Sequence, residues 1–278
     1  MAAYNQANAQ PFSLGPVLNP SAIKQEGDSI NSSKALHGFR RRIYAVYGQT
    51  PGGKTLQGFP DRLQSRIPFL RHIMKRHFPA SRDSAILDLG CGHGALMQLL
   101  KAAGYTNVRG VDASPEQVRL ARGLGVAGVV QGDLLATLEG VADRSLDVIA
   151  TFDVLEHFTK PEVGLIAEKV REALKPSGRW IIHTTNGESP FAGRTAFGDI
   201  THETIFTRNS LSQMLKAYGF WRVNCFEDRP VPHGFNSTMR YLLWGLIRSL
   251  LLLYVAVETG DLDRHGIFSQ NFTAVAYK

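Results

Sequence analysis

The sequence predicts an α/β fold in which helices cover a doubly wound, mainly parallel sheet of seven strands. Five short apolar runs alternate with helix-forming segments, as expected for parallel strands joined by helical crossovers. These runs occupy residues 85–89, 108–112, 129–133, 146–152 and 179–185. Glycines at alternate positions follow the first run, and a carboxylate, Asp112, ends the second. Together these features predict a nucleotide-binding βαβ unit of the Rossmann-like type.

The remaining elements follow from the same periodicity. We expect helices at residues 95–103 and 209–218, and two closing strands at residues 221–227 and 269–277. The segment Lys-Pro-Ser-Gly at 175–178 indicates a turn before the fifth strand.

The domain organisation is one domain behind an N-terminal arm. Residues 1–60 are expected to form a flexible arm, with a helical extension leading into the domain at 61–278. Within the domain, residues 187–208 are the expected acceptor loop and residues 229–267 the expected helical insertion.

Composition limits the function classes. At 278 residues and 44% hydrophobic, the chain can bury one large core. Two cysteines, Cys91 and Cys225, form no disulfide framework, and no signal peptide is evident, so we expect a cytoplasmic protein. The net charge of +7 fits a solvated face or an anionic partner. Basic and aromatic residues do not interleave as in RNA-binding modules, so no nucleic-acid partner is expected.

One motif is interpreted as a decoy. Residues 48–55 match the phosphate-binding pattern G-x-x-x-x-G-K-T letter for letter. A true loop of this kind opens a helix, but Gly58 and Pro60 stand where the first helical turns would be. We interpret the segment as a flexible loop and a candidate lid, not as an ATP site.

The glycine turn discriminates between nucleotide cofactors. Dinucleotide sites have the spacing G-x-G-x-x-G, whereas Gly90, Gly92 and Gly94 give G-x-G-x-G, with Asp88 two places before the first glycine. A carboxylate there repels phosphates and attracts the ammonium and sulfonium groups of S-adenosylmethionine. The turn therefore favours S-adenosylmethionine over NAD.

Two further carboxylates complete this site. Asp112 can accept hydrogen bonds from ribose hydroxyls, and Asp133 can meet the adenine amino group at the same sheet edge. The motifs DLGCGHG, VDAS, QGD, DVLEHF and LKPSGRWII occur in the order and spacing of class I S-adenosylmethionine-dependent methyltransferases, which residues 84–186 resemble. The cofactor-binding set so implied is Asp88, Gly90, Cys91, Gly92, Asp112, Ala113, Asp133, Leu134 and Phe152.

The fourth strand delivers a candidate base to the carboxyl edge of the sheet. Methyl transfer requires the acceptor to be positioned and deprotonated, and His157 suits a general base. The alternative is that His157 only binds a neighbouring loop. This segment also resembles quinone-biosynthesis O-methyltransferases, which implies a divalent cation on Asp153, Glu156 and His157. The chain has Asp153 where that family has Glu, which shortens the ligand arm.

A second polar cluster lies in the acceptor loop. The pattern Asp199-x-x-His202 resembles the acceptor loop of methyltransferases found with polysaccharide and glycolipid enzymes. His202 is then a second candidate base with Asp199 orienting it, and the alternative is a cap for the next helix. Arg194 and His183 are weaker candidates.

These features predict an O-methyltransferase with an open acceptor identity. A hydroxyl on a sugar, glycan or glycolipid is the first expectation. The alternative acceptor is a small aromatic, quinone-like or other secondary metabolite. A non-catalytic methyltransferase-like binding module predicts damaged cofactor motifs, and here they are intact.

The most apolar segment is residues 240–257. A spanning helix needs about 20 apolar residues, and this run is shorter with Arg248 at its centre, so spanning is not expected. Three interpretations stay open: a buried helix covering the core or a dimer partner, a wall of the acceptor pocket, or an interfacial helix in peripheral contact with a membrane.

Overall fold

The computed structural model describes residue 38, residues 42–43 and residues 59–278. Contacts divide the chain into residues 1–43 and residues 44–278, and all that follows concerns the second unit. Most of the arm that we expect to be flexible, and the decoy motif at 48–55, lie outside the described residues.

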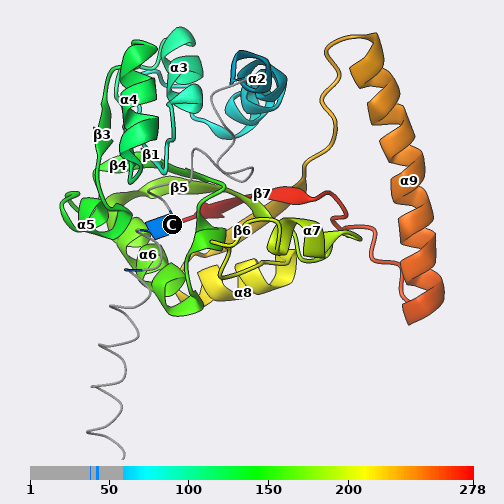
Figure 1. Cartoon of the computed structure of the whole chain (residues 1–278). Coiled ribbons are helices and arrows are strands. Elements are labelled where there is room, and N and C mark those ends of the chain that lie inside the picture. Colours follow the sequence, from blue (N-terminus) through cyan, green and yellow to red (C-terminus); the bar gives the residue numbers. More distant parts are fainter. Residues whose placement is uncertain (1–37, 39–41, 44–58) are drawn as a thin grey trace, which may run out of the picture. The chain divides into compact units, whose positions relative to one another are not determined.

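The predicted seven-stranded sheet is present (Figure 1). Its order is β3-β2-β1-β4-β5-β7-β6, and β7 runs antiparallel to both of its neighbours. The strands are β1 (Ile86–Leu89), β2 (Val108–Asp112), β3 (Val129–Gln131), β4 (Leu146–Phe152), β5 (Leu174–Thr185), β6 (Arg222–Glu227) and β7 (Asn271–Tyr277). From β1 the chain adds β2 and β3 on one side, and it then continues with β4 on the other side of β1. Ligands of doubly wound folds bind at this change in strand order, between β1 and β4.

Helices cover both faces of the sheet. The helices of this part of the chain are α2 (Phe59–His77), α3 (Ala95–Ala102), α4 (Pro115–Gly123), α5 (Leu134–Glu139), η2 (Leu155–His157), α6 (Lys160–Ala173), α7 (Ala192–Ala196), α8 (Arg208–Ala217) and, apart from the sheet, α9 (Phe235–Thr259). The helix α2 is the predicted N-terminal helical extension.

The turn predicted at 175–178 is a bulge inside β5. Leu146 pairs with Leu174 and Val148 pairs with Arg179, so four residues of β5 lie opposite one residue of β4. The strand therefore begins at Leu174, before the segment that the sequence assigned to a turn.

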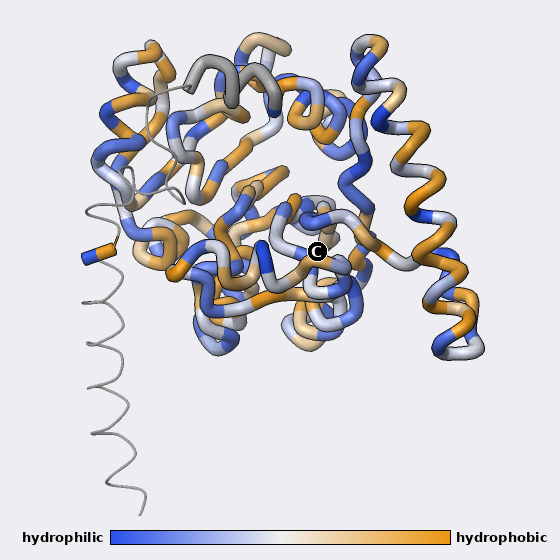
Figure 2. The backbone as a smooth tube through the Cα atoms, turned by 45° about the vertical axis from the view of Figure 1, so that its right-hand side comes forward, coloured by the Kyte–Doolittle hydropathy of each residue, from blue (hydrophilic) through white to orange (hydrophobic). Residues whose placement is uncertain are grey.

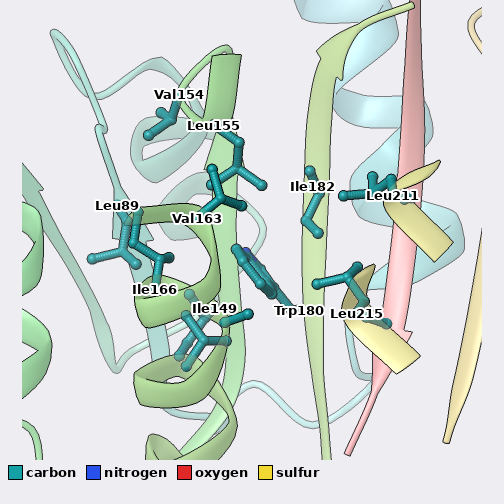
Figure 3. Close-up of a cluster of buried hydrophobic side chains, with 14 of the residues drawn as sticks. Leu89, Ile149, Val154, Leu155, Val163, Ile166, Trp180, Ile182, Leu211 and Leu215 are labelled. Carbon is teal, nitrogen blue, oxygen red and sulfur yellow. The ribbon is translucent and has the colours of Figure 1, made fainter. Parts of the chain in front are cut away.

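The core lies on both sides of the sheet. On one side Trp180 packs among side chains of α6 and α8, with Val163, Ile166, Leu211 and Leu215 around it (Figure 3). The indole N–H of Trp180 donates to the hydroxyl of Thr151 at 3.0 Å, so burial leaves no unpaired donor there. The second apolar layer packs under α2, α3 and α4.

The apolar helix α9 stands outside these layers (Figures 1 and 2). Ser237 is the only one of its residues that is buried, so the interpretation of a helix buried over the core is wrong. The helix is long and apolar enough to cross a membrane, and none of its most apolar window is buried. The apolar sequence indicated that this segment would be removed from water, but it did not indicate which surface would cover it.

Candidate cofactor and acceptor site

The glycine turn after β1 is built by backbone geometry that favours glycine. Gly90, Gly92 and Gly94 have φ of 72°, 54° and 80°. A Cβ on Gly90 would lie 2.4 Å from a methyl of Val154, whereas a Cβ on Gly92 would meet nothing closer than 3.7 Å. The turn therefore packs tightly against the segment after β4, and Gly92 leaves open space where a ligand can lie against the backbone.

Asp112 closes the turn from the end of β2. Its carboxylate accepts hydrogen bonds from the backbone N–H of Gly92 at 2.7 Å and of Ser114 at 2.8 Å. Each oxygen keeps a second lone pair, which suits a pair of ribose hydroxyls. Burial raises the pKa of Asp112, and the two N–H groups oppose that shift.

Asp88 is a buried carboxylate at the end of β1. The residue is 2% exposed. Burial, and then the nearby charge of Asp112, raise its pKa to about 7. A buried carboxylate in this state fits a site that a cationic group completes, as the ammonium and sulfonium of S-adenosylmethionine would.

The other predicted cofactor residues have mixed surroundings. Asp133 is the N-cap of α5 and accepts from the N–H of Ala136 at 3.0 Å, a local role that the sequence analysis did not assign to it. Leu134 is buried and Ala113 is exposed. Burial raises the pKa of the Cys91 thiol, which makes it a packing residue rather than a nucleophile.

The two candidate bases lie side by side. The rings of His157 and His202 are edge to face, with centroids 4.8 Å apart. Nδ1 of His202 lies 2.8 Å from the carbonyl oxygen of Thr195, and because a carbonyl only accepts, Nδ1 carries the hydrogen. The lone pair of neutral His202 is therefore on Nε2, the arrangement that a general base needs.

Asp199 is linked to His157 through Thr201, and its carbonyl oxygen accepts a hydrogen bond from the backbone N–H of His202 at 3.2 Å. The hydroxyl of Thr201 donates to Asp199 at 2.7 Å and lies 2.7 Å from Nδ1 of His157, which therefore donates to that hydroxyl. The backbone N–H of Thr201 also donates to Asp199. Burial, and then the neighbouring His202, lower the pKa of His157 to about 4, so its ring is neutral near pH 7.

The predicted metal ligands do not converge. Within residues 59–278 no group of three His, Cys, Asp or Glu side chains could hold a metal ion. The carboxylate of Asp153 is held by Arg66 at 2.9 Å, while Glu156 accepts from the hydroxyl of Thr184 at 3.0 Å. Burial, and then Asp153, raise the pKa of Glu156 to about 8, which favours its neutral form. The donors of the proposed metal site are thus directed to protein partners.

His183, a weaker candidate in the sequence, lies at the centre of a buried ionic network. Its Nδ1 is 2.6 Å from Asp153 and its Nε2 is 2.7 Å from Asp228. Despite complete burial, these two carboxylates raise its pKa to about 10, so the ring is an imidazolium. Arg66 binds the other oxygen of Asp153, and Thr273 donates to Asp228 at 2.9 Å.

Asp153 adopts a rare backbone conformation in this network. Its φ is 57°, and its N–H donates to the carbonyl of His183 at 3.0 Å. Sequence analysis missed Arg66 and Asp228 as partners of this site. No local signal marks them, because they come from α2 and from the end of β6.

Comparisons with known proteins agree with this geometry. A family model described as "Methyltransferase domain" matches residues 63–223, more than half of the chain. The ubiquinone biosynthesis O-methyltransferase of Azorhizobium caulinodans is 34% identical over 131 residues, covering 44% of this chain and 51% of that protein. The mitochondrial protein of that name from Arabidopsis thaliana is 31% identical over 134 residues, covering 44% and 41%. The chain spans about half the length of the curated relatives it matches.

Solved structures share the fold. An S-adenosylmethionine-dependent methyltransferase from Archaeoglobus fulgidus has a TM-score of 0.59 at 20% identity, covering 79% of this chain and 98% of that one. The phosphoethanolamine N-methyltransferase 2 of Haemonchus contortus, solved with S-adenosyl-L-methionine, has a TM-score of 0.54 at 16% identity, covering 76% and 52%. With the family match and the cofactor turn, these likenesses lead to one conclusion: the chain belongs to the class I S-adenosylmethionine-dependent methyltransferases.

Proposed function

We propose that the protein transfers a methyl group from S-adenosylmethionine to a hydroxyl of a small aromatic, quinone-like acceptor. The observation that carries the proposal is the histidine pair next to the cofactor turn. Val154 lies against Gly90 in that turn, and the N–H of His157 donates to the carbonyl of Val154 at 3.1 Å. The short helix η2 therefore joins His157, which lies beside His202, to the cofactor turn at the edge of the sheet.

The residues divide the work between them. Bound S-adenosylmethionine supplies an activated methyl group on a sulfonium. We assign proton removal from the acceptor hydroxyl to Nε2 of His202, whose tautomer is set by the Thr195 carbonyl. His157, neutral near pH 7 and held through Thr201, positions the edge of the His202 ring. The acceptor oxygen bonds to the methyl carbon as the carbon–sulfur bond breaks, and the hydroxyl proton goes to His202.

The acceptor class draws its support from the relatives rather than from the acceptor loop. Several similar proteins are named ubiquinone biosynthesis O-methyltransferase, which favours a quinone-like acceptor over a sugar. The sugar hypothesis drew on the Asp199-x-x-His202 pattern, the positive charge and the apolar helix, and in one form of it Asp199 and His202 contact sugar hydroxyls. One oxygen of Asp199 already accepts two hydrogen bonds from Thr201, so less of its capacity is left for a sugar.

The test is a methyl-transfer assay with His202→Ala and, as comparison, His157→Asn. A panel of dihydroxylated aromatics and of simple sugars is offered with labelled cofactor. We expect transfer to an aromatic hydroxyl and a loss of about 100-fold or more in kcat for His202→Ala, with cofactor affinity unchanged by calorimetry. Transfer to sugars alone would overturn the acceptor class, and an active His202→Ala would overturn the assignment of the base.

A further inference from the structure

The helix α9 is fixed at the edge of the sheet that carries the site. It connects β6, which ends at Glu227, to β7, which begins at Asn271, and Asn271 pairs with Thr185 at the carboxyl end of β5. At mid-helix, the guanidinium of Arg248 donates to Glu227 at 3.0 Å and to the carbonyl of Gly266 at 3.1 Å. Asp228 of the ionic network directly follows Glu227, so α9 stands beside the acceptor side of the molecule (Figure 1).

The two sides of α9 differ in what they contact. Ser237, Trp244, Arg248 and Val255 recur at helical spacing and are the less exposed residues, so they face the body. The opposite side carries ten large apolar residues that are 43% exposed or more. We call these residues the α9 outer face: Phe235, Met239, Leu242, Leu243, Leu246, Ile247, Leu250, Leu253, Tyr254 and Val257.

The width of the α9 outer face favours lipid over a second helix. At 3.6 residues per turn its ten positions cover an arc of roughly 140°. A helix pair buries a narrower seam with charged residues on its flanks, and it would leave Leu243, Ile247 and Tyr254 in water. The α9 outer face has no charged member, and a bilayer interface can cover the whole convex arc.

Large exposed apolar residues also lie in the acceptor loop. Phe191, Phe197 and Ile200 are 71%, 88% and 72% exposed around α7, in the segment that leads to His202. Large apolar groups of this size in contact with water mark an interaction surface.

Charge complementarity indicates which membrane. Residues 59–278 carry 25 Lys and Arg against 22 Asp and Glu, a net charge of +3, and Arg240 is exposed near the amino-terminal end of α9. The anionic residues Glu258 and Asp261 lie at its carboxyl-terminal end. An anionic bilayer would therefore attract the body of the protein and the amino-terminal half of the helix most strongly.

A spanning orientation conflicts with the contacts of α9. Glu227 is 5% exposed at its side chain and pairs with Arg248, which is 17% exposed. Moving α9 across a bilayer would break this pair and leave both charges in a poor environment. A helix lying in the interface keeps the pair, because Arg248 faces the protein and not the lipid.

We propose that the α9 outer face docks on the surface of an anionic membrane. The acceptor loop then opens toward the bilayer, so the enzyme can take an amphiphilic acceptor from the lipid phase. This second statement rests on the proposed function, whereas the docking itself does not.

The test is flotation of the full chain with vesicles. Vesicles of phosphatidylcholine alone are compared with vesicles containing one third phosphatidylglycerol. We expect binding to the anionic vesicles, and a loss of roughly 100-fold in partition for Leu242→Gln/Leu246→Gln/Leu253→Gln, because three apolar side chains leave the lipid. The matched control is Leu124→Gln/Val130→Gln/Leu165→Gln, three exposed apolar residues directly after α4, on β3 and on α6, which should bind like the unmodified protein.

The outcomes separate the alternatives. Equal binding by both triple variants, or no binding by the unmodified protein, would overturn docking through α9. A dimer in light scattering that the α9 variant alone converts to a monomer, without vesicle binding, would assign the surface to a second copy instead. Cofactor binding by calorimetry reports folding of each variant. Activity on a water-soluble acceptor tests the proposed function separately, because the α9 variant should retain it.

Discussion

The cofactor turn after β1 and the ionic network at the ends of β4, β5 and β6 lie at the same edge of the sheet, but contacts of different range build them. In the turn, Asp112 binds Gly92 and Ser114, residues 20 and 2 positions away. In the network, Arg66 and Asp153 are 87 positions apart, and Thr273 and Asp228 are 45 apart. The comparison teaches that the methyl donor is held by a short, local unit, whereas the acceptor side depends on distant parts of the chain meeting correctly.

The largest expected effect is on the network. His183→Ala removes the imidazolium between Asp153 and Asp228 and leaves two buried carboxylates without it, so we expect a loss of about 3–5 kcal/mol in the free energy of unfolding. Urea denaturation at pH 7 measures it. Lys169→Ala breaks a solvent-screened surface pair with Glu172 and should leave the free energy of unfolding nearly unchanged.

The pH dependence of this loss has a definite sign. The folded-state pKa of His183 is raised from 6.5 to about 10, so its contribution is complete below pH 6.5 and is lost as the pH rises toward 10. The stability difference between the unmodified protein and His183→Ala should therefore shrink from pH 7 to pH 10. A difference that stays constant over this range would contradict an imidazolium at the centre of the network.

A smaller effect of opposite sign is expected at the cofactor turn. Asp88→Asn removes a buried carboxylate whose pKa is raised from 3.8 to about 7. Below pH 3.8 the carboxyl is neutral in both states and its burial costs no charge. Between pH 3.8 and pH 7 the cost of keeping it buried increases. Relative to the unmodified protein, the variant should therefore gain about 2–4 kcal/mol in the free energy of unfolding at pH 8 and nothing at pH 4. Thermal unfolding at the two pH values measures the gain.

The same substitution should weaken cofactor binding. Without the carboxylate, affinity for S-adenosylmethionine should fall by roughly tenfold or more in calorimetry. Asp143→Asn is the matched control, because it makes the same change at an exposed carboxylate that precedes β4, away from the cofactor turn. If Asp88→Asn bound the cofactor normally, Asp88 would have only a structural role.

The smallest effect is expected at the histidine pair, which belongs to neither the cofactor turn nor the ionic network. Thr201→Val keeps the shape of the side chain but removes the hydroxyl between His157 and Asp199, so we expect kcat to fall about tenfold with the cofactor Kd unchanged. Thr204→Val is the control, since its hydroxyl donates only to the Phe158 carbonyl. Equal kcat values for the two variants would remove Thr201 from the positioning of the histidines.

Local patterns account for the parts of the fold that were predicted well. The apolar runs at 108–112 and 146–152 coincide with β2 and β4, because buried parallel strands leave a continuous apolar signal. The start of β5 was misplaced because a bulge opposite β4 looks like a turn in the sequence. Asp133 carries a helix cap, a short-range role that the sequence permits but that the cofactor motif concealed.

By itself, the sequence determined the doubly wound sheet, the glycine turn with Asp88 and Asp112, and thus the methyl donor. These depend on hydrophobic periodicity and on backbone conformations set within a few residues. Only the tertiary structure showed that Asp199 is linked to His157 through Thr201 and that α9 is exposed. It also showed that Arg66 and His183 bind Asp153, so this carboxylate is not directed toward a metal site. The physical reason is that hydrogen-bond partners and burial depend on which distant segments meet, and a pattern of neighbouring residues carries no record of that.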